Sequence, residues 1–414
     1  MGIYNGYQCS ICNAIFQPDE NIYVCPHDGG NLDVLLDVNE IRKSDSKQRI
    51  LNSTEASIWR YLPLLPIGEP GGQGTPLRVV GWTPVFTTKR LQAELEIERL
   101  WIKDESRNPT ASFKDRASAV VVARAREIGA EFVVTASTGN AGAALAGMAA
   151  AVGQKAIIFA PRTAPQAKIA QLLVYGARVI LVNGSYDQAF DLSVKASEEY
   201  GWYCRNTGYN PFTAEGKKTA AFEIWEQVLI SKKELKKNLC VFVSVGDGNI
   251  ISGLHKGFKD LKALGWLATM PRIFGVQSKG SAAISNAFIA GTEDIEPVHS
   301  ETLADSISVD LPRDGVRALR AARETGGAYI LVTDNEILGA IRGLGKSGIF
   351  AEPAGAAAYA GVVNARKEGI IGSDDPVLAL VTGSGLKDIR SAMQAVAKAP
   401  IIEPNLKALK KIIQ

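Results

Sequence analysis

The residues that could do chemistry begin with a lysine in a turn of small side chains, at residues 108–116 (NPTASFKDR). Lys114 follows Ser112 by two positions, and an Ala/Val-rich run that is typical of a helix starts at Ala117. A lysine that is desolvated in a pocket has a lowered pKa, so its free amine can act as a nucleophile and as a base. The turn is therefore a candidate site for covalent chemistry on an aldehyde.

Three further Gly- or Ser-rich turns follow predicted strands and open predicted helices, at residues 137–140 (STGN), 244–249 (SVGDGN) and 382–385 (TGSG). In an open α/β sheet, ligands bind at the carboxyl ends of the strands, where such turns lie. Residues 246–253 (GDGNIISG) offer backbone N–H groups at a helix start, which can hold a phosphate. They do not form the GxGxxG dinucleotide fingerprint, because Ile251 stands where a glycine is required.

A second lysine motif, Gly345-Lys346-Ser347, resembles the end of a nucleotide-binding P-loop. The first glycine of that loop would fall at Ala340, and the preceding NEILGAIRGL predicts a helix where the loop needs a strand. We therefore interpret the motif as the C-terminal turn of a helix, and we do not expect nucleotide hydrolysis.

A cluster of cysteines near the N-terminus predicts a small zinc-ribbon-like module. Cys9 and Cys12 form one CxxC knuckle, while Cys25 begins a second knuckle in which Asp28 stands in place of the last cysteine. Asp28 or His27 could complete a tetrahedral zinc site, and the alternative is a ribbon that has lost its metal. We expect catalysis to survive metal loss, because nothing in the ribbon resembles the segments described above.

The elements that must position these turns alternate between strands and helices. Short β-branched runs predict strands at residues 132–135, 155–159, 179–182, 240–245, 272–276, 328–332 and 377–381. Between them, longer runs predict helices that include residues 139–152, 164–175, 186–200 and 217–229. Strands of about five residues alternating with helices of about a dozen indicate βαβ units, and hence an α/β fold with parallel sheets.

Length and composition limit the possible classes of protein. A chain of 414 residues is too long for one ordinary core. We expect a ribbon-like module at 1–40, a large lobe at 41–110 and 205–400, a small lobe at 111–204 and a tail at 401–414. The net charge of +3 implies no surface for nucleic acid, and no apolar run predicts a membrane span or a signal peptide. Five cysteines, an odd number, favour reduced thiols in a cytoplasm.

Taken together, the motifs resemble those of a known family. SRNPTASFKDR, TASTGNAGAALA, GYNPFTAEGKKT, FAEPAGAAA and TGSGLKD, with the glycine loop at 246, are similar to the landmarks of fold-type II pyridoxal-phosphate enzymes. Their order, with WRYLPLLP upstream, is most similar to the threonine synthase family, over about residues 55–390. The resemblance implies a two-lobed fold similar to that of the tryptophan synthase β chain, lyase activity and pyridoxal 5'-phosphate as cofactor. We also expect a homodimer.

The resemblance further implies roles for individual residues. Lys114 would form a Schiff base with the cofactor and carry protons between Cα, Cβ and Cγ of the substrate. Asn140 would bond the phenolic oxygen, and Thr382 the pyridine nitrogen. The other expected cofactor-binding residues are Phe113, Gly246, Asp247, Gly248, Asn249 and Ile250. The expected substrate-binding residues are Ser137, Thr138, Gly139, Lys168, Asn210 and Lys217. The expected metal ligands are Cys9, Cys12, Cys25 and Asp28.

Some neighbouring residues have simpler interpretations. We interpret Asp115 and Arg116 as a helix-start ion pair, and Glu352 as a residue of a family landmark close to the site. Asp305 and Ser306 either line the pocket or pack beside it.

The chain departs from the threonine synthase pattern in one segment. The family reads roughly NSxNPxRxEGQKT, and its arginine is suited to the phosphate of O-phosphohomoserine. Here Thr213 takes the position of that arginine, and Gly208 resembles an insertion. Lys168 or Lys217 could supply the missing positive charge.

Three hypotheses of function follow. The first is threonine synthase: O-phospho-L-homoserine and water give L-threonine and phosphate. The second, which Thr213 keeps open, is β-elimination or β-replacement on serine, threonine or phosphoserine, as in a dehydratase or a cysteate synthase. The third is a zinc-ribbon binding protein without catalysis, which the lysine turn and the glycine loops make improbable.

Overall fold

The computed structural model describes residues 4–18, 22–231 and 235–413, and three β-sheets organise them. An antiparallel sheet near the N-terminus has the strand order β2-β1-β3. A parallel sheet has the order β8-β7-β6-β9, and a large sheet has the order β12-β11-β10-β13-β5-β4. In the large sheet β4 runs antiparallel to β5, and the other pairs are parallel.

The strands of the antiparallel sheet are β1 (Tyr4–Cys9), β2 (Ile15–Phe16) and β3 (Leu32–Leu36). Those of the four-stranded sheet are β6 (Phe132–Ala136), β7 (Lys155–Pro161), β8 (Arg178–Val182) and β9 (Tyr203–Cys204). Those of the large sheet are β4 (Val85–Thr87), β5 (Leu100–Asp104), β10 (Cys240–Ser244), β11 (Arg272–Ser278), β12 (Tyr329–Val332) and β13 (Val377–Val381).

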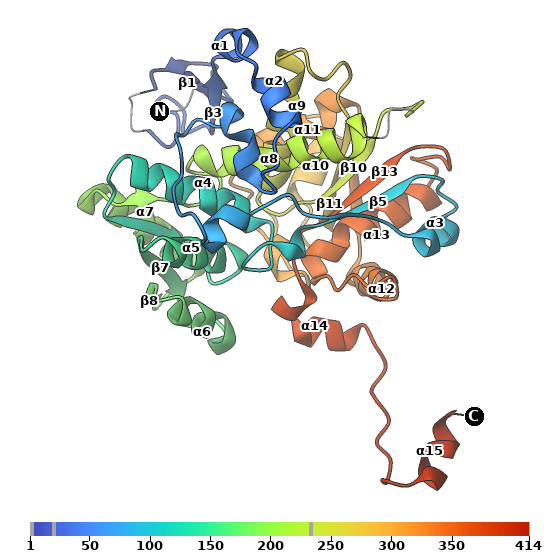
Figure 1. Ribbon diagram of the computed structural model, residues 1–414. Helices are drawn as coiled ribbons and strands as arrows, with labels where there is room; N and C mark the ends of the chain where they lie inside the picture. The colour runs from blue at the N-terminus through green and yellow to red at the C-terminus, as the bar shows by residue number, and fades with distance from the viewer. Residues whose placement is uncertain (1–3, 19–21, 232–234, 414) are drawn as a thin grey trace.

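Helices surround the parallel sheets, and the last helix stands apart at the end of an extended segment (Figure 1). The helices up to residue 200 are α1 (Val38–Lys43), α2 (Ser46–Leu51), α3 (Lys89–Leu95), α4 (Lys114–Glu127), α5 (Asn140–Ala151), α6 (Gln166–Val174) and α7 (Tyr186–Tyr200). The later helices are α8 (Phe212–Ile224), α9 (Asn249–Ala263), α10 (Ala283–Ala290), α11 (Gly315–Thr325), α12 (Asp334–Gly345), α13 (Pro353–Lys367), α14 (Ile389–Gln394) and α15 (Leu406–Ile413).

The large sheet is buried on both faces, which explains why its strands are apolar throughout. Val241 and Val243 of β10 belong to the core that contains α9 and α11. Phe242, between them, points to the other core, where it stacks on Phe274 at a ring distance of 4.6 Å and where α13 packs. Strands covered on both faces in this way read as continuous runs of β-branched and aromatic residues, because neither face meets water.

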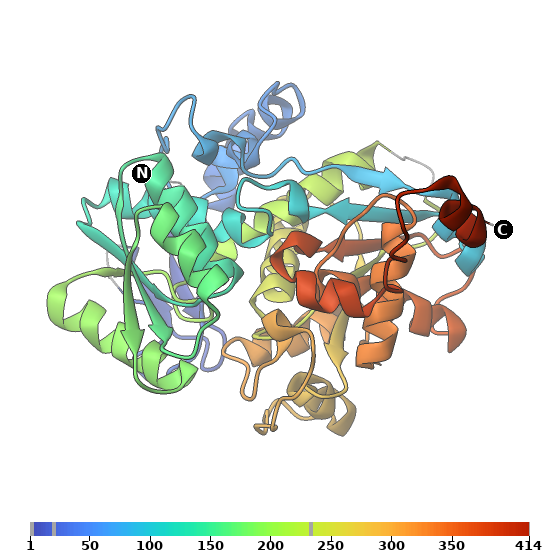
Figure 2. The ribbon, with the colours of Figure 1, turned by 90° about the horizontal axis from the view of Figure 1, so that it is seen from below.

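The two parallel sheets lie on opposite sides of the molecule, with the four-stranded sheet in green at one side (Figure 2). Helix α4 packs against α5, on the side of the four-stranded sheet. It also packs against α8, which in turn packs against α9. Gly216 allows α8 to approach α4 closely, because a Cβ there would lie 2.2 Å from the backbone oxygen of Arg116. The carboxyl ends of strands from both sheets therefore face a common region beside α4.

The α/β class and the parallel sheets are confirmed, and the predicted strands and most helices agree with the structure within a few residues. The predicted helix at 217–229 is wrong in its start, because α8 begins at Phe212, where the Asn210 side chain accepts the Phe212 N–H at 2.8 Å. Lys346 ends α12, as expected. Within the described ranges, no helix combines the length and the apolar character that crossing a bilayer requires.

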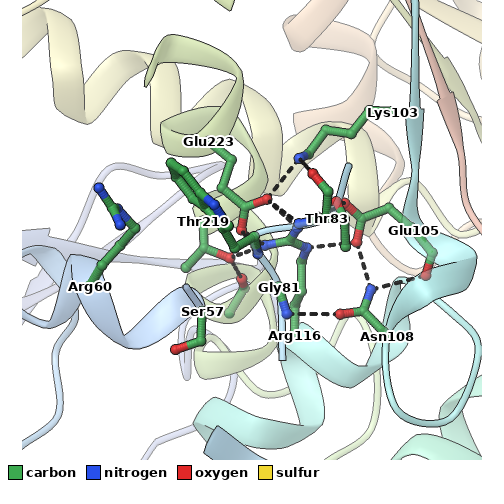
Figure 3. A network of polar contacts seen from close by, with 12 residues as sticks. Ser57, Arg60, Gly81, Thr83, Lys103, Glu105, Asn108, Arg116, Thr219 and Glu223 are labelled. Atoms are coloured by element: carbon green, nitrogen blue, oxygen red, sulfur yellow. Dashed lines mark hydrogen bonds and ion pairs between the residues drawn. The ribbon is translucent and has the colours of Figure 1, made fainter. Parts of the chain in front are cut away.

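A buried network of charges joins α4, α8 and β5 (Figure 3). The Arg116 guanidinium donates to Glu105 at 2.7 and 2.8 Å and to Glu223 at 2.5 and 2.8 Å. Lys103 donates to Glu223 at 2.7 Å, and all four side chains are shielded from water. The expected pair between Asp115 and Arg116 is therefore wrong: the two cations and two carboxylates of this network compensate one another instead.

Glu223→Gln should lower the free energy of unfolding by about 3–5 kcal/mol, because it leaves Arg116 and Lys103 buried without their shared carboxylate. Guanidinium unfolding followed by circular dichroism measures the change. Glu131→Gln is the matched control: Glu131 pairs with Lys155 at the surface, where such a pair contributes at most about 1 kcal/mol. Equal unfolding of the two variants would show that the network does not carry stability.

Candidate active site

Two adjoining cavities lie between the parallel sheets. The inner cavity is lined by Lys114, Thr207, Ser244 and other residues, and the outer cavity has a volume of about 150 Å³. They share Asn140, Ser306, Glu352 and Ala354. All expected cofactor-binding residues line the inner cavity: Phe113, Lys114, Asn140, Gly246, Asp247, Gly248, Asn249, Ile250 and Thr382. Of the expected substrate-binding residues, the outer cavity brings together Thr138, Gly139 and Lys168.

Lys114 is the first residue of α4, and the turn before it is fixed to the end of β13. The Phe113 N–H donates to the Thr382 carbonyl at 2.8 Å, and the Ser384 N–H donates to the Ala111 carbonyl at 3.1 Å. Ala111 has a φ of +63°, which is unusual for a residue with a Cβ and requires that its surroundings fix the turn. These two backbone hydrogen bonds place Lys114 at the wall of the inner cavity.

The Lys114 amine is suited to nucleophilic chemistry. Within the described part of the chain, its Nζ has no hydrogen-bond or ion-pair partner. The carboxylates of Asp247 and Glu352 act on it only through their charges, at longer range. Burial lowers the pKa of Lys114 to about 8, with a further contribution from the charge of Arg205. A substantial fraction of the amine is therefore unprotonated near neutral pH, as an attack on an aldehyde requires.

Asp115 closes the lysine turn and does not pair with Arg116. Its carboxylate accepts the Thr110 N–H at 2.6 Å and the Thr110 hydroxyl. Burial raises the pKa of Asp115 to about 6, although these hydrogen bonds oppose the shift. The side chain thus holds the turn in shape, a role that no pattern in the sequence indicates.

The glycine loop after β10 fits a phosphate group. Gly248 has a φ of +90°, and a Cβ there would lie 2.5 Å from the Asp314 carbonyl oxygen, so only glycine fits. Helix α9 begins at Asn249, so its first N–H groups and its dipole point toward the loop. The buried Ser244 hydroxyl lines the same cavity and has no hydrogen-bond partner among the described residues. These features fit the phosphate of the expected cofactor.

Asn249 connects the loop to α8. Its Nδ2 donates to Asp314 at 2.6 Å, and its Oδ1 accepts from the Thr213 hydroxyl at 3.2 Å and from the Lys217 amine. Thr213 and Lys217 are both buried, and neither lines the inner or the outer cavity. Burial lowers the pKa of Lys217 well below its ordinary value, together with the charges of Lys114 and Arg205. Lys217 therefore lies behind the loop.

Asn140 and Glu352 meet between the two cavities. The Asn140 amide donates to the Glu352 carboxylate at 2.8 and 3.1 Å, which fixes the orientation of the amide. Burial raises the pKa of Glu352, while the bond from Asn140 opposes that shift. Gly383 allows this arrangement, because a Cβ there would lie 2.3 Å from Glu352 Oε1. Glu352 orients the residue that is expected to face the phenolic oxygen of the cofactor.

The loop before α5 borders the outer cavity. The Ser137 hydroxyl accepts the Gly139 N–H at 3.2 Å, and α5 begins at Asn140, so free N–H groups and the helix dipole face this cavity. Such a site suits a carboxylate. On the other side, Lys168 forms an ion pair with Asp305. Ser137 itself is not among the lining residues.

Asn210 lies away from both cavities, although we expected it to bind substrate. Its Nδ2 donates to the Cys204 carbonyl at 2.7 Å, and its Oδ1 caps the start of α8. Its substrate-binding role, like those of the other residues above, stays a prediction. The expected metal ligands are also distant from the cavities, but they do come together: their ligand atoms all lie within 4.8 Å of one another.

Arg205 is a feature that sequence reasoning missed. Its side chain is fully buried, donates to the hydroxyls of Ser118 at 3.1 Å and Thr207 at 2.7 Å, and leaves Nη2 without a partner among the described residues. Burial lowers the pKa of Arg205 to about 10. Its position in CRNTGYNPF, beside the segment in which the family arginine is missing, was the available signal.

Solved structures share this architecture. Threonine deaminase isoform 2 from Solanum lycopersicum aligns with a TM-score of 0.66 and 25% identity, over 78% of this chain and 86% of that chain. Maize serine racemase aligns with a TM-score of 0.61 and 25% identity, over 73% of this chain and 88% of that chain. The expected two-lobed fold-type II architecture is confirmed.

The sequence comparisons agree with the geometry. The family model "Pyridoxal-phosphate dependent enzyme" matches residues 77–383. A threonine synthase of Methanocaldococcus jannaschii is 38% identical over 414 residues, which cover 98% of this chain and 99% of that protein. A threonine synthase of Methanosarcina acetivorans is 35% identical over 410 residues, which cover 98% of each chain. The chain therefore belongs to the threonine synthase family of pyridoxal-phosphate-dependent enzymes.

Proposed function

We propose that this protein converts O-phospho-L-homoserine and water to L-threonine and phosphate. The observation that carries the proposal is the match to threonine synthases of two organisms over 98% of the chain. The lysine turn, the glycine loop and the loop before α5 also converge on adjoining cavities, as a bound cofactor and an amino-acid substrate require. In the reaction the Cγ–O bond breaks to release phosphate, and water adds at Cβ.

Pyridoxal phosphate, when bound, supplies an electron sink that stabilises negative charge at carbons near the substrate amino group. The glycine loop would hold its phosphate, and the Thr382 hydroxyl would face its ring nitrogen. The N–H groups at the start of α5, from Asn140 onward, would bind the substrate carboxylate and so orient the Cα–H bond toward Lys114. The sequence pattern and the lining of the two cavities support these assignments.

Lys114 moves the protons. Its pKa of about 8 lets the free amine accept a proton from Cα and from Cβ and return one at Cγ, where phosphate has left. One group can serve these positions because the three carbons are consecutive and the lysine side chain is flexible. Asn140, held by Glu352, keeps its amide fixed during these transfers.

The phosphate of the substrate needs positive charge, which the family arginine would supply. Positions 213 and 217 lie four residues apart on α8, so their side chains share one face of the helix, and both bond Asn249 Oδ1. The family pattern has Arg and Gln there, whereas this chain has Thr213 and Lys217. Lys217 lines neither cavity itself, so we infer that it acts on the substrate site through Asn249, which lines the inner cavity.

A second candidate function rests on Thr213. Without the arginine, the site would also accept an amino acid that carries no phosphate, and the fold is shared with a threonine deaminase and a serine racemase. The enzyme would then catalyse β-elimination or β-replacement on serine, threonine or phosphoserine. The products, described below, separate the two functions.

We further infer a homodimer in the cytoplasm, with the lobe boundaries expected from the sequence and with no nucleic-acid partner. The cysteines are all unpaired, which suits a reducing compartment. The two parallel sheets, formed by strands within 85–104 and 240–381 and within 132–204, support the division into a large and a small lobe.

The purified protein should be yellow, and borohydride should bleach it and leave a pyridoxyl mass on the peptide that contains Lys114. After cofactor removal, the rate of rebinding should rise with pH around a midpoint of about 8, because only the free amine reacts. Mass spectrometry and stopped-flow absorbance measure both. Lys155→Met, at an exposed lysine, should change neither result. A label on another lysine would contradict the assignment.

Isotope labelling tests the reaction. In water enriched in ¹⁸O, threonine should carry the label at its Cβ hydroxyl while the released phosphate should carry none, because the C–O bond breaks. In D₂O, deuterium should enter the methyl group, since Lys114 returns a solvent-exchanged proton to Cγ. Release of a 2-keto acid from serine or threonine, with O-phosphohomoserine left intact, would instead establish β-elimination.

The charge at α8 is tested by exchanging the two residues. Lys217→Gln removes the charge-assisted bond that Lys217 donates to Asn249; such a bond contributes about 1.5–3 kcal/mol, so kcat/KM for O-phosphohomoserine should fall by roughly ten- to over a hundredfold. Adding Thr213→Arg to that variant recreates the family pattern and should restore most of the loss. Thr213→Arg alone places two cations beside Asn249 and should destabilise the protein. Additive effects of the two substitutions would show that the charges do not compensate.

A further inference from the structure

We propose that Cys9, Cys12, Cys25 and Asp28 bind one structural zinc ion, and that this ion holds the segment 203–209 that leads into the active site. The residues of the N-terminal sheet do not line either catalytic cavity. The N-terminal module nevertheless bonds to Cys204 and Gly208, on either side of Thr207, which lines the inner cavity.

The ligand atoms are already spaced for a tetrahedral metal. With zinc–sulfur distances of 2.3 Å and zinc–oxygen distances near 2.0 Å, neighbouring sulfurs should be about 3.8 Å apart, and sulfur and oxygen about 3.5 Å. The Cys12 and Cys25 sulfurs are 3.6 Å apart, and Cys9 Sγ lies 3.3 and 3.6 Å from the two Asp28 oxygens. All four ligand atoms lie within 4.8 Å of one another.

The surrounding backbone supports the ligands. The Ile11 N–H donates to Cys9 Sγ at 3.3 Å, and the Gly30 N–H donates to Asp28 Oδ1 at 2.8 Å. Gly30 leaves room for the ligands, because a Cβ there would lie 2.8 Å from Cys9 Sγ and 2.9 Å from Asp28 Oδ1 and would displace them. Outer contacts of this kind orient metal ligands and offset their negative charge.

Zinc fits this set better than other common metals. Three thiolates and one carboxylate in a tetrahedral arrangement are ligands that zinc prefers, whereas magnesium and calcium require oxygen ligands. Four protein ligands leave no open position, so the ion would be structural and not catalytic. Cys12 and Asp28 are exposed, so a chelator can reach the site.

The second knuckle, residues 25–30, is bordered by two residues that hold the active-site segment. Tyr23 accepts the Cys204 N–H on its hydroxyl at 3.0 Å, and its ring stacks on Tyr209 at 5.0 Å. The Asn31 amide donates to the Gly208 carbonyl at 2.7 Å. Gly208 is the residue that resembles an insertion relative to the family. These contacts fix both ends of the short run that contains Arg205 and Thr207.

A second connection reaches the glycine loop. Arg317 donates to the Asp33 carboxylate at 2.7 Å and to the Leu32 carbonyl at 3.1 Å, both on β3. The same guanidinium donates twice to Asp314 at 2.7 Å, and Asp314 accepts from Asn249. The module is thus linked to the residue that starts α9, and its order bears on the phosphate cradle.

These contacts revise the expectation that catalysis is indifferent to the metal. Loss of zinc would leave the second knuckle held by the Cys25–Gly30 and Gly29–Cys25 backbone hydrogen bonds and would let three thiol or thiolate groups and a carboxylate move apart, so we expect Tyr23 and Asn31 to be less firmly positioned. We therefore expect metal loss to loosen residues 203–209 and to weaken substrate binding while the lobes stay folded.

Elemental analysis of the full-length holoenzyme, purified under reducing conditions with zinc supplied, tests the site. We expect one zinc per chain in the wild type and in Cys240→Ser, a buried cysteine outside the cluster, and almost none in Cys25→Ser. Cobalt in place of zinc should give the absorption bands of a tetrahedral thiolate site. Asp28→Cys should retain the metal and shift those bands toward four thiolates. A metal-free wild type would overturn the proposal.

Hydrogen exchange tests the link to the active site without depending on the identity of the substrate. After chelation, exchange in a peptide covering residues 203–209 should accelerate at least tenfold, while a peptide from α12 should not change. Asn31→Ala should retain zinc yet accelerate exchange in the same segment, and should raise KM more than it lowers kcat. Unchanged exchange at 203–209 after complete zinc removal would overturn the structural link.

Discussion

The position of Lys114 depends on the buried charges around Arg116. Residues two apart on an α-helix point about 200° from each other, so Arg116 can enter the network with Glu105 and Glu223 while Lys114 faces the cavity. Charges buried without water require close and correctly directed partners, which leaves the first turn of α4 little freedom. The network thus holds β5, α4 and α8 in one arrangement, and this arrangement fixes the position of the Lys114 amine.

Around the cavities, in contrast to the Arg116 network, some polar and charged groups lack partners within the described ranges. Lys114 makes no ion pair with any carboxylate of the described residues, and the Ser244 hydroxyl has no partner there. Buried polar groups normally find partners, and those that do not are commonly waiting for a ligand. A cofactor phosphate, a substrate carboxylate and a substrate phosphate are all anions. The N–H groups at the starts of α5 and α9 and the unpartnered Ser244 hydroxyl therefore suit the anions that the proposed ligands bring.

The sequence made the repeating elements predictable, because strand and helix periodicity are local. The same holds for the turns that carry Lys114, Asn140, Gly246 and Thr382, since parallel topology brings the ends of strands together. The partners of charged side chains were not predictable. Glu223 lies far along the chain from Arg116, and no pattern near either residue indicates the other. Local reasoning for that reason paired Arg116 with its neighbour Asp115.

The same limit explains why Asn210 and Lys217 were expected in the cavity. The segment between β9 and α8 has no regular structure, so side chains must satisfy its backbone. Asn210 bonds the Cys204 carbonyl and the start of α8, and Asn206 accepts the Ala136 N–H at 2.8 Å. Residues that a family pattern presents as one functional motif thus divide here into those that contact the cavity, such as Thr207, and those that hold the segment in shape. The segment is held in shape by its own asparagines, which bond to the backbone at Ala136 and Cys204, and by Asn31 of the N-terminal module, which donates to the Gly208 carbonyl.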